Sequence, residues 1–527
     1  MVPRWGYGRS HTSSSESTAG VTSRAGSSTK QKASPASSGS ANDERSSAPR
    51  ATKQSLVPRL RAGVVGRQPH LHEARRALAR EGHLGVLDPA AGREQGHLAG
   101  PEHGVGAQRV AVVQRSGDDP GDDLDAGVAV GLETGASAQV VVVVADHRAE
   151  AGALGVVVVP EGEGVPEGAS TEDGRGPSIW DTFTAAPGVV RDGTSGATAS
   201  GHLDRYVEDV GLMKQLGTSD YRFSISWPRV QPDGRGPVNP EGLDFYDRLV
   251  DELLAAGIDP MATLYHWDLP QALEDDGGWL NRGTVDRFEE YAAIVAERLA
   301  DRVAHWVPVN EPNVATMFGY AVGIHAPGRR LMFDALHVSH HLLLAHGRGA
   351  VALRAAGAQS VGCANHHAPM WPATEDEADV GATKLFDALW NGMSLEPMLL
   401  GRYPADLQPL LEGLVREGAL ATIRQPLDFY GVNYFMPMRV GAAPEDSEMF
   451  FALYDLVGYP ETDFGWPVVP DAMREWLITF RARYRAALPP LVVTECGAAY
   501  SGDPDADGRV EDEARIDYLH GHLEAVA

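Results

Sequence analysis

Two short segments of the chain decide the fold. Residues 303–311 read Val-Ala-His-Trp-Val-Pro-Val-Asn-Glu, and residues 491–495 read Leu-Val-Val-Thr-Glu. Each is a short run of residues that favour β-strands, and each ends in a glutamate. Four other runs have the same form, and they cover residues 221–227, 261–265, 360–365 and 428–433. The sequence therefore predicts six strands with functional side chains at their ends.

Amphipathic helical patterns separate these six runs. The expected helices cover residues 204–216, 240–256, 287–299, 335–356, 382–400 and 471–485, and a last one begins near residue 511. Gly217 and Gly257 follow the first two, where glycine readily adopts the left-handed conformation that ends a helix. Strands that alternate with helices on this scale predict a parallel sheet, either open or closed.

The side chains at the strand ends favour a closed sheet. Functional groups follow all six runs: Arg222, His266 with Trp267, Asn310 with Glu311, Asn365 with His366, Asn433 with Tyr434, and Glu495. Groups at the carboxyl ends of many strands are typical of a (β/α)8 TIM barrel in the α/β class. The alternative is an open, doubly wound nucleotide-binding sheet, but no glycine-rich phosphate loop follows any strand.

Composition divides the chain near residue 170. Of 38 aromatic residues, only Trp5 and Tyr7 precede Trp180, and residues 8–178 contain no Ile or Met. These side chains supply much of the buried area of a folded core. We therefore expect residues 1–170 to be a low-complexity extension, either disordered or translated from an incorrect start. Residues 171–527 are expected to be the folded domain.

Within the extension, two kinds of pattern suggest structure. The valine-rich runs 140–144 and 156–159 resemble strands, but they lack apolar partners to pack against. His70, His72 and His83 suggest zinc ligands, although no Cys or carboxylate stands at the spacing of a zinc site. We therefore expect local structure at most, and no metal site.

Charge excludes several classes of partner. The formal net charge is -27, and residues 171–527 carry all but one of these excess negative charges. Such a domain repels nucleic acid phosphates and anionic membranes. There is no apolar run long enough to cross a bilayer and no secretory signal pattern. Cys363 and Cys496 both lie in apolar segments, which favours a reducing, cytoplasmic location.

The two strand-end glutamates, Glu311 and Glu495, indicate a reaction. Glycoside hydrolysis uses one carboxylic acid to protonate the leaving oxygen, and a carboxylate to attack the anomeric carbon or activate water. The chemistry needs no metal or organic cofactor. The predicted ligand is a small β-glycoside or an oligosaccharide.

Seven motifs in order resemble glycoside hydrolase family 1, the β-glucosidase family. They lie at residues 172–181, 221–229, 264–270, 309–312, 323–328, 429–434 and 493–497. The resemblance implies a retaining β-glycosidase that acts on terminal non-reducing β-D-glycosides. It implies that Glu311 is the acid/base and Glu495 the nucleophile, about 5–5.5 Å apart. It also implies substrate or site contacts for His266, Trp267, Asn310, Asn433, Arg222 and Tyr434, with Arg222 keeping Glu495 ionised.

The chain departs from the family pattern at four places. Val165-Pro166 replaces Gln-Ile in the opening motif, and Phe435 replaces a tyrosine after Asn433-Tyr434. No first strand is recognisable in residues 152–164, and the eighth strand is missing. We therefore predict a barrel that lacks two neighbouring strands. Two alternatives follow, a non-catalytic carbohydrate-binding relative and an inactive truncated product. The oligomeric state is not predicted.

Overall fold

A computed structural model describes residues 138–143, 155–160, 172–190, 196–197, 199–444, 447, 449–502, 505–506 and 510–527. The chain forms two units, and all of these residues belong to the unit made of residues 1–8 and 93–527. The other unit, residues 9–92, lies outside the described residues, as do the histidines considered as zinc ligands. The predicted division of the chain at residue 170 therefore stays a prediction.

All six predicted strands are confirmed. They are β3 (Asp220–Ser224), β4 (Asp259–Tyr265), β5 (His305–Val309), β6 (Cys363–His366), β8 (Tyr430–Asn433) and β11 (Leu491–Glu495). Neighbours among them run parallel: β3 with β4, β4 with β5, β6 with β8, and β8 with β11. Two isolated parallel bridges, Trp306 with Val361 and Asn310 with Ala364, join β5 to β6.

Two described strands bear on the expectation that the barrel lacks a first strand. Strand β2 (Gly155–Pro160) pairs parallel with β3, where a first strand belongs. Strand β1 (Ala138–Val143) pairs antiparallel with β2. The valine runs form these strands without aromatic residues because a strand ladder is made by backbone groups and needs only residues that favour extended structure.

Strand β1 also contacts β11, the last of the six predicted strands. The order β2-β3-β4-β5-β6-β8-β11-β1 therefore returns to its start. This closed order is a barrel and rejects the open nucleotide-binding sheet. One strand of the ring, β1, runs opposite to the other seven.

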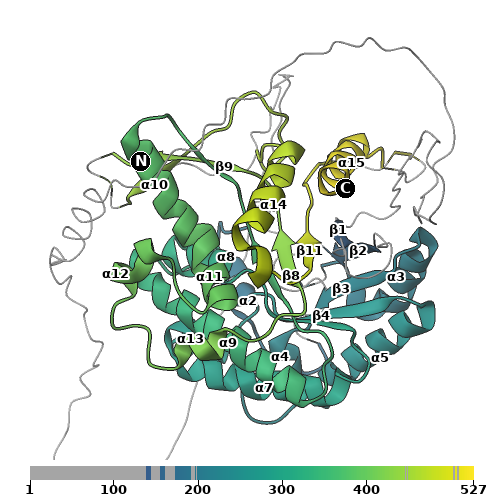
Figure 1. The fold of residues 1–527 in the computed structure, drawn as a ribbon. Helices are drawn as coiled ribbons and strands as arrows, with labels where there is room; N and C mark the ends of the chain where they lie inside the picture. The colour runs from purple at the N-terminus through teal and green to yellow at the C-terminus, as the bar shows by residue number, and fades with distance from the viewer. Residues whose placement is uncertain are drawn as a thin grey trace, which may run out of the picture. The chain divides into compact units, whose positions relative to one another are not determined.

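Helices surround the barrel, close to the ranges that the apolar patterns predicted. The longer ones, labelled in Figure 1, are α3 (His202–Leu216), α5 (Pro240–Ala256), α7 (Gly283–Leu299), α9 (Leu336–Ala355), α10 (Glu377–Asp387), α11 (Met393–Leu400), α14 (Pro470–Tyr484) and α15 (Glu513–Val526). Gly217 (φ 75°) and Gly257 (φ 81°) end α3 and α5 in the left-handed conformation, as predicted. The remaining elements are short. They are α2 (Ile179–Thr184), α4 (Trp227–Val230), α6 (Gln271–Asp275), η1 (Gly278–Leu280), α8 (Pro312–Val314), η2 (Ala315–Ala321), η3 (Met332–Ala335), η4 (Ala388–Gly392), η5 (Ala405–Leu407), α12 (Gln408–Leu411), α13 (Ala419–Ile423) and η6 (Arg485–Ala487).

A second sheet, which the sequence did not predict, lies outside the ring. Its strands are β7 (Met370–Pro372), β9 (Met438–Ala442) and β10 (Phe451–Tyr454), in the order β10-β9-β7. Strands β7 and β9 continue the chain soon after β6 and β8. The sheet therefore extends two barrel strands beyond the end where the functional groups stand.

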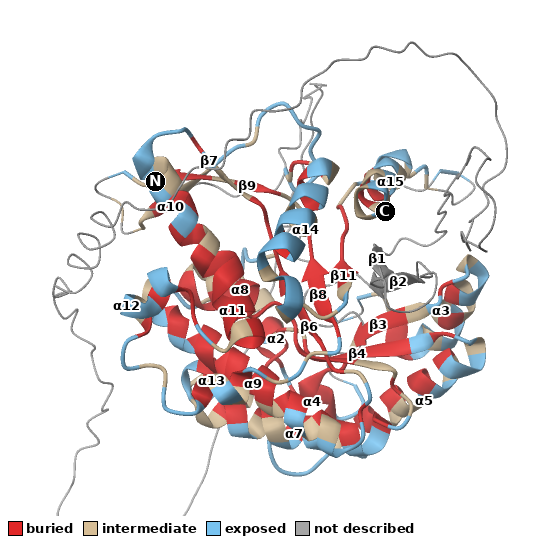
Figure 2. Cartoon of the chain, in the orientation of Figure 1, coloured by how far each residue is buried: buried red, intermediate tan, exposed pale blue. Residues whose placement is uncertain are grey.

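The core fills the barrel and the layer between strands and helices. Figure 2 shows buried residues along β3, β4, β8 and β11 and on helices such as α9 and α11. A small cluster of five buried side chains comes from or beside five strands: Met261, Val307, Ala364, Phe429 and Val492. Among the described residues, no helix is both long and apolar enough to cross a membrane.

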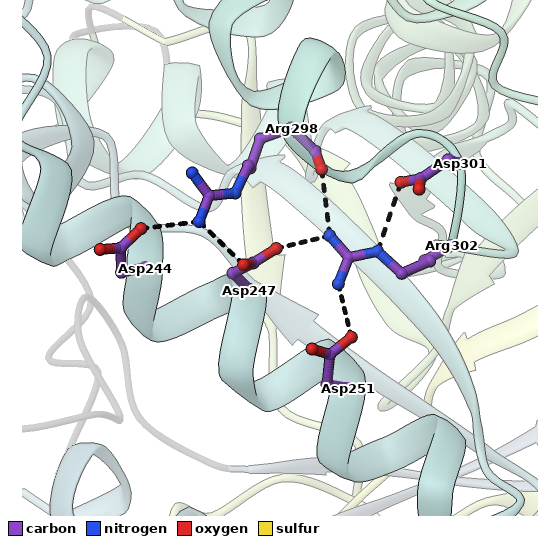
Figure 3. A network of polar contacts seen from close by, with 6 residues as sticks. All are labelled: Asp244, Asp247, Asp251, Arg298, Asp301 and Arg302. Carbon is purple, nitrogen blue, oxygen red and sulfur yellow. Dashed lines mark hydrogen bonds and ion pairs between the residues drawn. The ribbon is translucent and has the colours of Figure 1, made fainter.

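On the outer surface, charged side chains join α5 to the carboxyl end of α7 (Figure 3). Arg298 donates to Asp244 and Asp247, and Arg302 donates to Asp247 and Asp251. The Arg298 bond, followed by the bond from Arg302, lowers the pKa of Asp247 to about 2 against the cost of its partial burial. The network links α5, which follows β3, to α7, which follows β4. Strand β3 carries Arg222, and His266 directly follows β4.

Candidate active site

The parallel strands carry their functional residues to one end of the barrel. All eight predicted site residues lie in or directly after strands at that end: Arg222 on β3, His266 and Trp267 after β4, Asn310 and Glu311 after β5, Asn433 on β8, Tyr434 after β8, and Glu495 on β11. Because parallel strands place their carboxyl ends together, residues far apart in the sequence can form one site.

Arg222 joins three of these strands through its guanidinium group. Its Nη1 donates to Glu495 Oε1 over 2.5 Å and to the Thr494 carbonyl over 3.4 Å. Its Nη2 donates to Asn310 Oδ1 over 2.7 Å. The Arg222 side chain is 1% exposed and the Glu495 side chain 7%, so little water screens this ion pair.

Asn433 reaches the second glutamate. Its Nδ2 donates to Glu311 Oε1 over 2.7 Å and to Asn310 Oδ1 over 3.2 Å. Glu311 is buried, with 2% of the residue exposed. Glu311 and Glu495 thus belong to one hydrogen-bonded set, joined through Asn433, Asn310 and Arg222. The separation of 5–5.5 Å remains a prediction.

Two residues of the site have a backbone conformation that side chains rarely adopt. Glu311 has φ 44° and Trp267 has φ 78°. Left-handed conformations of residues other than glycine are strained, and they concentrate at functional sites. The Glu311 amide donates to the Ala364 carbonyl on β6 over 2.9 Å, which helps to hold this turn.

Burial sets the protonation of Glu495. Removal from water raises the pKa of this carboxyl, while the Arg222 charge and hydrogen bond, and then the Asn433 amide, pull it down. Arg222 was expected to keep Glu495 ionised by lowering its pKa. Here the cost of burying the charged carboxylate is larger than the effect of Arg222, so the pKa of Glu495 is raised. Arg222 instead limits the increase and favours the ionised form that a nucleophile needs.

His266 is neutral near neutral pH. Burial, with a smaller effect of the nearby Arg222 charge, lowers its pKa to about 3. Its Nε2 lies 3.0 Å from Asn310 Nδ2. Because an amide nitrogen only donates, Nε2 is the acceptor and the proton of the ring is on Nδ1.

Trp267 packs beside this set of residues. Its Nε1 donates to the Asn310 carbonyl over 3.0 Å. Its ring lies 5.3 Å from the His266 ring and 5.8 Å from the His325 ring, centroid to centroid. The indole nitrogen is therefore bonded to protein, which leaves the ring, and not the N–H group, as the surface offered to a ligand.

Tyr434 does not join the hydrogen-bonded set, in contrast to its prediction as a substrate contact. Its side chain is buried, and its hydroxyl donates to the Val469 carbonyl over 2.9 Å. Its ring lies 5.8 Å from that of His522 on α15. Successive residues of an extended strand point to opposite faces, so Tyr434 points away from the side that Asn433 faces.

The prediction also missed residues around the site. Trp390 Nε1 donates to His366 Nδ1 over 3.0 Å, and the His366 ring stacks on Phe435 at 5.5 Å. Asn313 Nδ2 donates to the backbone carbonyls of both His366 and Trp390. His366 was named among the strand-end groups but was not included in the predicted site. Trp390 had no such signal, because a tryptophan in a helical apolar pattern looks like any core residue.

The described residues contain no group of three or more His, Cys, Asp or Glu side chains arranged to hold a metal ion. The chemistry that the site offers is that of two buried carboxylates, one paired with a guanidinium and one bonded to an amide. Such a pair can supply a nucleophile and a proton donor within one site.

Comparisons with known proteins agree with this chemistry. The family model described as "Glycosyl hydrolase family 1" matches residues 165–527. Beta-glucosidase A of Acetivibrio thermocellus is 40% identical over 364 residues, which is 68% of this chain and 81% of that protein. Thermostable beta-glucosidase B of Thermobispora bispora is 44% identical over 401 residues, which is 73% of this chain and 82% of that protein.

A solved structure has the same fold. The virulence factor SghA of Agrobacterium tumefaciens, in complex with its substrate analog salicin, is 42% identical and has a TM-score of 0.66. The match covers 68% of this chain and 80% of SghA.

Proposed function

Because the chain belongs to glycosyl hydrolase family 1, we propose that it hydrolyses terminal non-reducing β-D-glycosides with retention of configuration. Glu495 is the nucleophile and Glu311 the general acid/base. The observation that carries this proposal is the set of bonds that joins Arg222 to Glu495 and Asn433 to Glu311. Glu495 accepts from the permanent cation Arg222, and Glu311 accepts from the neutral amide of Asn433.

In the first step, the Glu495 carboxylate attacks the anomeric carbon while Glu311 gives its proton to the departing oxygen. The difference between the two environments suits this division of roles. The bond from Arg222 Nη1 favours a charged Glu495. Burial of Glu495 raises the pKa of its carboxyl and removes the hydration shell that would weaken it as a nucleophile.

In the second step, Glu311 acts as a base and activates water, which releases the sugar from Glu495. Once Glu495 is esterified, it no longer carries a negative charge. Loss of this charge lowers the cost of ionising Glu311 nearby, because like charges disfavour each other in a buried site. One carboxyl can therefore serve as acid first and as base second.

We also propose the substrate contacts. His266 has its Nε2 bonded to Asn310, so Nδ1–H is left to donate to a sugar hydroxyl. The ring of Trp267 is available for contact with the apolar face of a sugar. Asn310 is expected to bond the 2-hydroxyl, for which a substrate must compete with its present partners, Arg222, Asn433 and His266. Arg222 and Asn433 are expected to position these groups.

Turnover of p-nitrophenyl β-D-glucoside and of salicin tests the proposal. Glu495→Gln and Glu311→Gln should each reduce kcat/KM by roughly a thousandfold or more, while the exposed Glu412→Gln serves as the matched control. Proton NMR of the reaction should detect the β-anomer of the released sugar first. Sugar binding without turnover by the unchanged protein would instead favour the non-catalytic carbohydrate-binding alternative.

Two further proposals concern the chain as a whole. The hairpin β1–β2 takes the place of barrel strands that the family sequence pattern would fill, and its pairing with β3 supports this. A reducing, cytoplasmic location is supported by two free, buried cysteines, Cys363 and Cys496. Fractionation of the native host, with an antibody to the protein, tests the location.

A further inference from the structure

The direction of every hydrogen bond in the site follows from Arg222. A guanidinium group has only donors, so Asn310 Oδ1, 2.7 Å from Nη2, must be an acceptor. The Asn433 atom that lies 3.2 Å from the same oxygen must then be the donor Nδ2. Asn433 Oδ1 therefore faces the other way and needs a donor of its own.

That donor is the hydroxyl of Thr494, whose Oγ1 lies 2.5 Å from Asn433 Oδ1. Thr494 is completely buried, so water does not compete for this bond. Rotation of the Asn433 amide by half a turn would place its Oδ1 against two other oxygens, Asn310 Oδ1 and Glu311 Oε1. Arg222 therefore leaves one orientation, in which Nδ2 faces Glu311 Oε1 over 2.7 Å and Oδ1 accepts from the Thr494 hydroxyl.

A β-bulge puts Thr494 in this position. In a regular strand, Thr494 and Glu495 would point to opposite faces. The register between β11 and β8 shifts between Val493 and Glu495, so Val493 pairs with Val432 and Glu495 pairs with Asn433. The extra residue, Thr494, is turned so that its hydroxyl reaches Asn433 while Glu495 reaches Arg222.

We propose that Thr494 is a positioning residue for the acid/base, acting through Asn433. Its hydroxyl gives Asn433 Oδ1 a donor and so holds the amide plane where Nδ2 meets Glu311 Oε1. A donor at this oxygen stabilises the ionised carboxylate and so keeps the Glu311 proton transferable near neutral pH. The inference rests on the proposed function of Glu311.

The test compares Thr494→Val with Thr494→Ser. Valine keeps the shape and removes the hydroxyl, and serine keeps the hydroxyl and removes the methyl group. Thr494→Val should lower kcat about tenfold and move the basic limb of the pH profile of kcat/KM upward by roughly half to one pH unit. In Thr494→Ser, the basic limb of the pH profile of kcat/KM should lie at the same pH as in the unchanged protein. Thr494→Ala replaces the valine variant if that variant does not fold.

The matched control is Thr263→Val. Thr263 is also a completely buried strand threonine, but its hydroxyl has no hydrogen-bond partner, so its loss should leave the limb unchanged. An unshifted limb in Thr494→Val would overturn the proposal. So would equal limbs in the serine and valine variants, because the hydroxyl, which serine keeps and valine lacks, would then not set the position of the limb.

A second readout separates this inference from the proposed function. The carboxyl 13C shift of Glu311, assigned by comparison with Glu311→Gln, gives its titration in the substrate-free protein. Thr494→Val should raise this midpoint and Thr494→Ser should not, whether or not the protein turns over a glycoside. Absence of turnover with a shifted midpoint would reject the proposed function alone, and an unshifted midpoint would reject the role of Thr494.

Discussion

Arg222 and Glu495, which are 273 residues apart in the sequence, form a buried ion pair over 2.5 Å. Residues from the second strand of the ring and from the last of the six predicted strands therefore meet inside it. The pair exists only if the intervening strands and helices are assembled, so it reports on the closed barrel as well as on the chemistry.

Removal of Arg222 should affect both activity and its dependence on pH. Arg222→Met leaves a buried carboxylate without its cation, so the pKa of Glu495 should rise further. We expect kcat/KM to fall roughly a hundredfold or more, and the acidic limb of its pH profile to move to higher pH. Pre-steady-state and steady-state kinetics between pH 4 and 9 measure this.

Arg235→Met is the control for this change, since Arg235 is about half exposed and pairs with Asp276 on the surface. Its kinetics should match those of the unchanged protein. An acidic limb that stays in place in Arg222→Met would contradict the argument, and a thermal melt shows whether the variant is folded.

A buried histidine should make stability depend on pH. His346 on α9 is completely buried, neither ring nitrogen has a hydrogen-bond partner, and burial lowers its pKa to about 4. The unfolded chain takes up a proton on this ring near pH 6.5, but the folded chain does so only near pH 4. The contribution of the neutral His346 ring to the free energy of unfolding is therefore complete above pH 6.5, and it is lost as the pH falls toward 4.

His346→Leu should remove this loss. The free energy of unfolding of the variant, relative to the unchanged protein, should increase by about 1.4 kcal/mol for each pH unit below 6.5. Urea unfolding at pH 7, 6 and 5 measures it. The exposed His337→Leu is the control, and parallel curves for His346→Leu and the unchanged protein would sink the idea.

Gly431 on β8 should accept no side chain. A Cβ atom there would lie 2.2 Å from the Cys363 carbonyl oxygen and 2.7 Å from Thr494 Cγ2. Gly431→Ala should therefore destabilise the protein by about 2 kcal/mol or more and reduce turnover, because Thr494 must move. Gly211→Ala on α3 meets open space and should be stabilising by about 0.5–1 kcal/mol. Thermal melts of both variants check the contrast.

The hairpin β1–β2 gives a fourth prediction. The chain 161–527 would leave β3 and β11 with unpaired edges, and such edges promote aggregation. We expect it to melt at lower temperature, or to aggregate, while the chain 93–527 keeps the melt of the full chain because the other unit ends at Gly92. Equal melting temperatures for the chain 161–527 and the full chain would contradict this prediction and would support a domain boundary at residue 170, as composition predicts.

The sequence predicted the six strands because their apolar runs are separated by helices with a clear period, and it predicted the site because parallel topology brings strand ends together. It found the valine runs of β1 and β2 to be strand-like but did not assign them to the barrel, because their pairing is made by backbone groups and composition does not report on these. Tyr434 lies outside the hydrogen-bonded set because a position one residue past Asn433 points to the other face. Thr494 was missed because a bulge changes which side chains point inward, and no residue type marks this bulge.

The pKa of Glu495 shows a different limit. Its cation partner was predicted from the sequence, but the depth of burial was not, and burial decides the direction of the shift. His266 is similar, since its pKa of about 3 follows first from desolvation. Electrostatics at a site depend on three-dimensional packing that a list of motifs does not contain.

The left-handed backbone at Glu311 and Trp267 also bears on how such a chain is maintained over generations. Glycine or asparagine would relieve this strain, which is about 1–3 kcal/mol at each position. Mutations toward these residues would therefore be favoured by drift if the chain were retained only for folding. A glutamate and a tryptophan at these two turns are instead the residues that selection for turnover would keep.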